Sequence, residues 1–113
     1  MLTIEYEGMT VKLDNEGYLI NGEDWNETVA HALAEREGLS TLTPEMLHIL
    51  TFMREYYEKY NGFPVLGAVC KNVHQPGTCV YEQFADPIKA WKIAGLRKPT
   101  TEVFSLLRHA IKL

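Results

Sequence analysis

Residues 42–60 read LTPEMLHILTFMREYYEKY, and this stretch predicts the central helix of the fold. Thr43 is a favoured helix cap, and Pro44 suits the first helical position because its missing N–H costs nothing there. The Asn61-Gly62 pair predicts the end of the helix. A helix this apolar is expected to lie in the middle of the molecule. Its apolar residues fall at three- and four-residue steps and are Met46, Ile49, Leu50, Met53, Tyr57 and Tyr60, with Leu47, Phe52 and Tyr56 widening the stripe.

The residues before this helix predict a β-hairpin and then a shorter helix. Apolar and polar residues alternate over positions 4–13, and Glu7-Gly8 supplies the turn between two strands. Asp24 is the expected N-cap of the shorter helix, with Glu27 three positions later completing a capping box. Gly38 should end that helix, because glycine tolerates the left-handed conformation of a helix C-terminus.

The residues after the central helix predict several short helices. We expect a short helix over 65–73, a loop over 74–78, a turn or short helix over 79–84 and a helix from Pro87 to Gly95. The predicted fold is therefore a single domain, residues 1–113, mainly α with a small N-terminal β-hairpin on five or six helices. A last helix should start at Thr100 or Thr101, with an apolar face of Val103, Phe104, Leu107, Ala110 and Ile111.

The charge is unevenly distributed along the chain. The net charge is −4, but residues 1–58 hold 12 acidic and 3 basic side chains, whereas residues 88–113 hold 6 basic and 1 acidic side chain. This asymmetry favours either solvated faces that attract one another or a basic docking surface near the C-terminus. No apolar run approaches the roughly 20 residues that span a bilayer, and no basic, apolar leader is visible, so we expect a cytoplasmic protein.

The stretch KAWKIAGLRKPTTEVFSLLRHAIKL, residues 89–113, resembles the C-terminal region of the DsrC/TusE sulfur-relay family. In that family an AGLPKP stretch precedes a cysteine, next to last in the chain, that carries sulfur. The resemblance extends to the central helix, where the family pattern F-x-R-x-(F/Y)-Y is matched by residues 52–57. It implies a DsrC-like helical bundle with helix-turn-helix-like arrangements, here residues 44–73 and 87–113. Further family landmarks in order are Gly17 to Leu19, Trp25, Pro64, Tyr81, Phe84, Pro87, Lys98 and Pro99.

Both carrier positions implied by the resemblance hold residues that cannot carry sulfur. Glu102 stands at the terminal cysteine, and Trp91 stands where some members have a second cysteine on the preceding helix. A carboxylate cannot become a persulfide. We therefore expect no family-type persulfide chemistry, no cofactor and no enzymatic activity of this chain's own.

Cys70 and Cys79 match neither carrier position. In a cytosolic chain we expect two reduced thiols packed as small apolar residues. The alternatives are a redox-active disulfide that works as a thiol switch, a relocated sulfur carrier, and a zinc site completed by His74. The C-x3-H-x4-C spacing resembles no strong zinc motif and lacks a fourth ligand, so no metal site is predicted.

The resemblance implies a binding partner of sulfur-relay or sulfite-reductase proteins, such as a TusBCD-type complex or a siroheme sulfite reductase. A helix-turn-helix DNA-binding regulator is the alternative from another class, although the negative net charge disfavours it. The sequence determines neither the oligomeric state nor the individual partner. The residues expected at a docking surface are Lys92, Arg97, Lys98 and Arg108.

Overall fold

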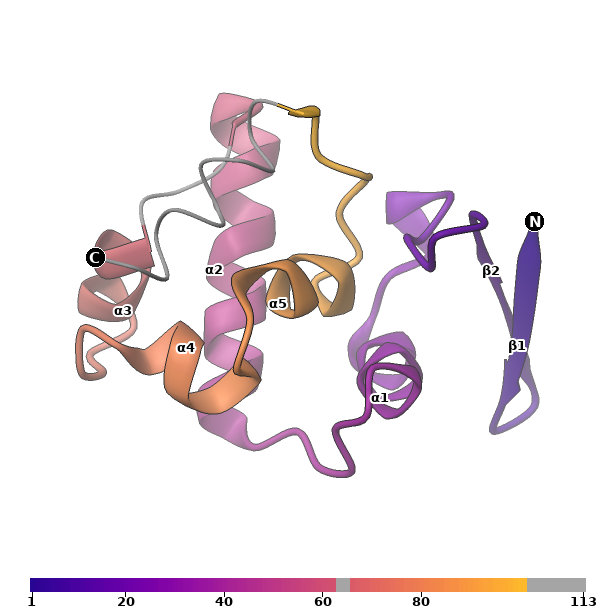
Figure 1. Cartoon of the computed structure of the whole chain (residues 1–113), viewed down its shortest axis with the longest axis horizontal. Helices are drawn as coiled ribbons and strands as arrows, with labels where there is room; N and C mark the ends of the chain where they lie inside the picture. Colours follow the sequence, from indigo (N-terminus) through magenta and orange to yellow (C-terminus); the bar gives the residue numbers. More distant parts are fainter. Residues whose placement is uncertain (63–65, 102–113) are drawn as a thin grey trace.

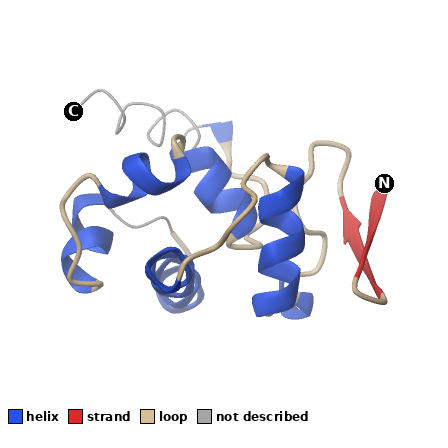
Figure 2. Cartoon of the chain, turned by 90° about the horizontal axis from the view of Figure 1, so that it is seen from below, coloured by secondary structure: helices blue, strands red, loops and turns tan. Residues whose placement is uncertain are grey.

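The computed structural model describes residues 1–62 and 66–101 of the chain. It is mainly α-helical, with one two-stranded antiparallel sheet at the N-terminus (Figure 1). Figures 1 and 2 both place the hairpin at one end of the long axis of the molecule. The predicted class, mainly α with an N-terminal hairpin, is confirmed.

The hairpin consists of β1 (Leu2–Tyr6) and β2 (Met9–Leu13), which pair without a bulge. Glu7 at φ 49° and Gly8 at φ 82° form the predicted turn, since two consecutive positive φ angles match the twist of a tight hairpin. Val11 on β2 points inward with the other apolar side chains of this face and is buried. The alternation seen in the sequence thus directs one face of the hairpin toward the helices.

Helix α1 (Glu27–Arg36) follows a single 3₁₀ turn, η1 (Gly22–Asp24). The predicted cap was wrong: Asn26 caps α1, because its Oδ1 accepts a hydrogen bond from the N–H of Val29 at 2.9 Å. Asp24 instead is the last residue of the 3₁₀ turn that precedes the helix. Gly38 lies just beyond the helix at φ 89° and ends it as predicted.

Helix α2 (Pro44–Tyr60) is the central helix predicted from its sequence. The Thr43 hydroxyl accepts a hydrogen bond from the N–H of Met46 at 3.2 Å, and Asn61 ends the helix at φ 51°. The prediction that Tyr60 belongs to the buried stripe was wrong, since its side chain is 59% exposed. It is the last residue of the helix, and its ring contacts that of Tyr56 at 4.7 Å between centroids, with the two planes tilted by 46°.

Three short helices complete the described part of the chain: α3 (Leu66–Asn72), α4 (Cys79–Phe84) and α5 (Pro87–Ile93). Asp86 caps α5 by accepting a hydrogen bond from the N–H of Ile88 at 2.8 Å. In Figure 1, α1 stands between the hairpin and α5, whereas α3 and α4 occupy the opposite end. The predicted last helix, with its apolar face from Val103 to Ile111, lies outside the described residues.

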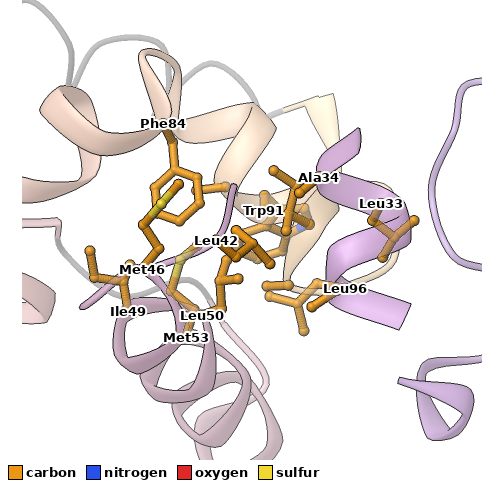
Figure 3. Packing of buried hydrophobic residues seen from close by; sticks show 14 of the residues in the cluster. Leu33, Ala34, Leu42, Met46, Ile49, Leu50, Met53, Phe84, Trp91 and Leu96 are labelled. Atoms are coloured by element: carbon orange, nitrogen blue, oxygen red, sulfur yellow. The ribbon is translucent and has the colours of Figure 1, made fainter. Parts of the chain in front are cut away.

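One hydrophobic core joins these elements. Ile49, Leu50 and Met53 on α2 are fully buried, and Figure 3 shows them in one cluster with Phe84 of α4 and Trp91 of α5. Each such aliphatic side chain stabilises the fold by about 1.5–3 kcal/mol relative to an exposed one. The core holds α5 firmly, and with it the connector that begins at Ala94. Within residues 1–62 and 66–101, no helix has the length and apolar character needed to cross a membrane.

Candidate functional site

The connector of residues 94–101, which carries the AGL and KP motifs, starts at a dense set of contacts. Arg54 of α2 donates a hydrogen bond from Nη1 to the carbonyl oxygen of Ala94 at 2.8 Å and another from Nη2 to that of Gly22 at 2.9 Å. Its guanidinium lies 4.6 Å from the centre of the Trp25 ring. We call this set, Gly22, Trp25, Arg54, Ala94 and Gly95, the Arg54 junction.

The Trp25 side chain fixes the connector from the other side. Its Nε1–H donates a hydrogen bond to the carbonyl oxygen of Ile93 at 2.8 Å. Gly95 follows at φ 71°, and a Cβ at this position would lie 2.3 Å from Cδ1 of Trp25. Both the backbone conformation and the ring contact therefore require glycine.

A cavity of about 490 Å³ opens beside the Arg54 junction. Partial burial lowers the pKa of Arg54, against the opposing effect of the Glu58 carboxylate, and the guanidinium stays charged because its ordinary pKa is far above neutrality. Both carboxylates and guanidinium groups line the cavity, so it presents no single sign of charge to a ligand. Its walls are formed by Leu19, Ile20, Asn21, Gly22, Glu23, Arg54, Tyr57, Glu58, Gly95, Leu96 and Arg97.

The sequence reasoning did not single out Arg54 or Trp25 as site residues. Both were visible as landmarks of the family resemblance, Arg54 in the F-x-R-x-(F/Y)-Y pattern and Trp25 on its own. Their joint role could not be read from the pattern, because the contacts link positions 40 and 68 residues apart.

Trp91, at one of the two carrier positions, is part of the core. The residue is 1% exposed, and its Nε1–H donates a hydrogen bond to the carbonyl oxygen of Arg97 at 2.7 Å. The ring of Tyr57 meets the indole edge-on, with 5.7 Å between centroids. The indole thus ties α5 to the connector. Glu102, at the other carrier position, lies outside the described residues.

Cys70 and Cys79 form a disulfide that joins α3 to α4. The Cα atoms are 5.7 Å apart, and both residues are fully buried. The expectation of two reduced thiols was wrong, because the chain reverses over residues 73–78 and brings the two helices within bridging distance. The expectation that both side chains are buried is confirmed. Sulfur atoms bonded to each other also offer no thiolate to a zinc ion, and His74 beside them is exposed.

Three of the four basic residues expected at a docking surface lie in the described part of the chain. Lys98 forms an ion pair with Glu16 at 2.6 Å, and both side chains are about half exposed. The ammonium of Lys92 lies 5.0 Å from the centre of the Tyr18 ring. Arg97 is exposed and lines the cavity at the Arg54 junction, whereas Arg108 lies outside the described residues. Lys92 and Lys98 thus lie beside two residues of the same turn, Tyr18 and Glu16, whereas Arg97 lines the cavity.

The helix-turn-helix-like arrangements are only partly described. Helices α2 and α3 lie within the first, residues 44–73, but residues 63–65 between them are outside the described ranges. Of the second arrangement, residues 87–113, the described residues comprise α5 and the connector.

Comparison with known proteins identifies the relatives of this chain. A protein-family model described as "DsrC like protein" matches residues 5–103. The sulfurtransferase TusE of Yersinia pestis is 37% identical over 105 residues, covering 85% of this chain and 95% of TusE. The gamma subunit of the dissimilatory-type sulfite reductase of Nitratidesulfovibrio vulgaris is 34% identical over 102 residues, covering 88% and 97%.

A solved structure supports the same relationship. The crystal structure of the oxidized gamma subunit of dissimilatory sulfite reductase, DsrC, from Archaeoglobus fulgidus aligns with a TM-score of 0.75 at 33% identity. The alignment covers 88% of this chain and 97% of DsrC. With a family model over most of its length and relatives above 30% identity, the chain belongs to the DsrC/TusE family.

Proposed function

We propose that this chain is a non-catalytic DsrC/TusE-type protein of sulfur metabolism. It binds sulfur-relay or sulfite-reductase proteins and does not carry sulfur on the family's C-terminal thiols. Relatives named sulfurtransferase TusE and sulfite reductase gamma subunit support the partner class. The observation that carries the second half of the proposal is Trp91, which fills one carrier position with a buried, hydrogen-bonded indole.

The chemistry of the side chains supports the absence of carriage. Persulfide formation needs a thiolate, and Glu102 supplies only a carboxylate. The chain has two cysteines in all, and Cys70 and Cys79 are bonded to each other in the interior. Neither sulfur can attack a donor in that state. In this role the chain uses no cofactor and acts in the cytoplasm as a single domain of residues 1–113.

The connector is the part of the surface we assign to partner docking. Trp91 and the Arg54 junction hold its first residues, so that Arg97 and Lys98 project from a defined backbone. Lys98 is paired with Glu16 at the surface, where such a pair contributes between about 0 and 1 kcal/mol. An acidic group of a partner can replace Glu16 at little cost. Lys92 and Arg108 are the further docking candidates.

A sulfur-loading experiment tests the carriage half of the proposal. The chain is incubated with a cysteine desulfurase, its relay proteins and cysteine, with and without a reductant, and its intact mass is measured. We expect no gain of a sulfur atom. The matched control is Glu102→Cys, which restores a thiol at the carrier position and should gain sulfur under the same conditions. A sulfur adduct on Cys70 or Cys79 of the native chain would overturn this half and reveal a relocated carrier.

A binding experiment tests the partner half separately. The immobilised chain is presented with a purified TusBCD-type complex and with a dissimilatory sulfite reductase, and binding is followed by surface plasmon resonance. Saturable binding to one of them is expected. Absence of binding to both would contradict the assigned partner class even if the loading result came out as expected.

A further inference from the structure

The outer edge of β1 is a feature that the proposed function leaves unused. Figures 1 and 2 place the hairpin at the end of the long axis, and β1 is its outermost strand. The far edge of β2 is occupied by residues 18–20. The carbonyl oxygen of Lys12 accepts a hydrogen bond from the N–H of Ile20 at 3.1 Å, and the N–H of Asp14 donates one to the carbonyl oxygen of Tyr18 at 2.8 Å. Among the described residues, no third strand covers β1.

Thr3 and Glu5 carry the unpaired backbone groups of this edge. In a hairpin with a two-residue turn, the closing pair exchanges hydrogen bonds, and the alternation of the ladder turns the N–H and C=O groups of Thr3 and Glu5 outward. Lys12, the residue opposite Thr3, turns its carbonyl away from β1 toward Ile20, in agreement with this alternation. No backbone hydrogen bond joins either residue to another described part of the chain outside the hairpin.

The edge also lacks the features that commonly prevent strands from associating. β1 reads LTIEY, without lysine, proline or bulge. Its one charged residue, Glu5, has its carboxylate held on the exposed face by the hydroxyl of Thr10 at 2.9 Å. A regular, unpaired edge of this kind is a template for another strand.

We propose that β1 pairs antiparallel with β1 of a second copy of this chain, with Ile4 opposite Ile4 at the two-fold axis. This register aligns the outward groups of Thr3 with those of Glu5 in the second copy, and the symmetry repeats the pair. No like charges face each other in it. A shift that placed Glu5 opposite Glu5 would do so, and a shift that placed Thr3 opposite Thr3 would set Glu5 opposite Met1, which lies outside the strand.

There is open space beside the edge, on the face where this pairing places apolar side chains of the second copy. A cavity of about 450 Å³ lies between β1 and α1, lined by Ile4, Glu5, Tyr6, Ala32, Glu35 and Arg36. Ile4 and Tyr6 are only half-buried there. The symmetric register brings Leu2 and Ile4 of the second copy alongside them on the same face of the sheet. The result is a four-stranded sheet with the apolar rows of both hairpins continuous across the axis.

Two substitutions of Thr3 separate this pairing from the stability of the hairpin itself. Within one copy Thr3 faces Lys12, but across the proposed interface it faces Glu5. Thr3→Glu therefore strengthens the hairpin and sets two like-charged pairs across the axis, which should raise the dimer dissociation constant about tenfold. Thr3→Lys weakens the hairpin and sets two opposite-charged pairs across the axis, which should lower that constant about fivefold.

The measurement is sedimentation velocity on the full chain from about 10 µM to about 1 mM. An interface made by one short strand of each copy is small, so its dimer is expected to dissociate within this concentration range. Thermal melts by circular dichroism report the hairpin effects. Thr3→Pro is the third variant: it removes an outward N–H and leaves the hairpin ladder intact, so it should stay monomeric throughout. A native chain that is monomeric across the series overturns the proposal and leaves the edge to a strand of a different protein. A dimer that Thr3→Pro leaves unchanged, or that Thr3→Glu tightens, also overturns it.

Discussion

The connector at residues 94–101 and the α3–α4 loop are both held in place, but by different means. The connector is fixed by non-covalent contacts of Arg54, Trp25 and Trp91 with backbone carbonyl groups. The α3–α4 loop is fixed by one covalent bond between Cys70 and Cys79. Among these three side chains, Trp25 bonds the residue farthest away in the sequence, 68 positions on at the end of α5, whereas the disulfide spans 9.

The contacts of the Arg54 junction restrain several elements of the fold at once, whereas the disulfide restrains one loop. The Arg54 junction joins η1, α2 and the end of α5, so its loss should affect the packing of the whole molecule. The disulfide closes a short loop and acts mainly by restricting the unfolded chain, an effect that grows only slowly with loop length. In this chain the disulfide thus secures the α3–α4 end of the fold, and the connector of residues 94–101 is held without a covalent bond.

The largest expected effect comes from Gly95→Ala. The new Cβ would collide with Trp25 and force an alanine into a left-handed conformation, so the free energy of unfolding should fall by about 3–5 kcal/mol. Gly38→Ala is the matched control, because Gly38 has a positive φ but no atom within 4 Å of an added Cβ. It should lose only about 1–2 kcal/mol. Urea unfolding measures both, and equal losses would mean that the ring contact at Gly95 is relieved at no cost.

Removal of the disulfide should have a smaller and more local effect. The double variant Cys70→Ala/Cys79→Ala should lose about 2.5–3 kcal/mol of unfolding free energy by the chain-entropy model. The fluorescence of Trp25 and Trp91 in the folded state should stay the same, because the Arg54 junction is intact. Dithiothreitol should lower the urea midpoint of the native chain and leave that of the double variant unchanged. Identical midpoints for the native chain with and without reductant would contradict a stabilising disulfide.

The smallest effect on stability is expected at the outer part of the connector. Lys98→Ala removes a half-exposed ion pair with Glu16 and should change the unfolding free energy by no more than about 0.5 kcal/mol. The association rate constant for the sulfur-relay or sulfite-reductase partner should nevertheless fall, and it should depend less on salt concentration. Lys71→Ala, the same charge change on α3 at the far end of the molecule, is the control. Equal association rates for the two variants would remove Lys98 from the docking surface.

Elements whose signals are local could be predicted from the amino-acid sequence. Thr43 and Pro44 start α2, Asn61 ends it, and the Glu7-Gly8 turn closes the hairpin, each as predicted. These features depend on φ preferences and on hydrogen bonds between residues at most four apart. The ordered landmarks of the DsrC/TusE family were likewise readable along the chain, and the comparisons confirmed the family.

Which distant residues meet became clear only from the folded molecule. The disulfide, the exposure of Tyr60 and the choice of Asn26 over Asp24 as a cap were not predicted. The contacts of Arg54 with Ala94 and Gly22 were missed as well. Spacing in the sequence gives the length of chain between two residues, but their distance in space depends on how the helices pack around the core. That packing is a property of all the buried side chains together, so no local pattern encodes it.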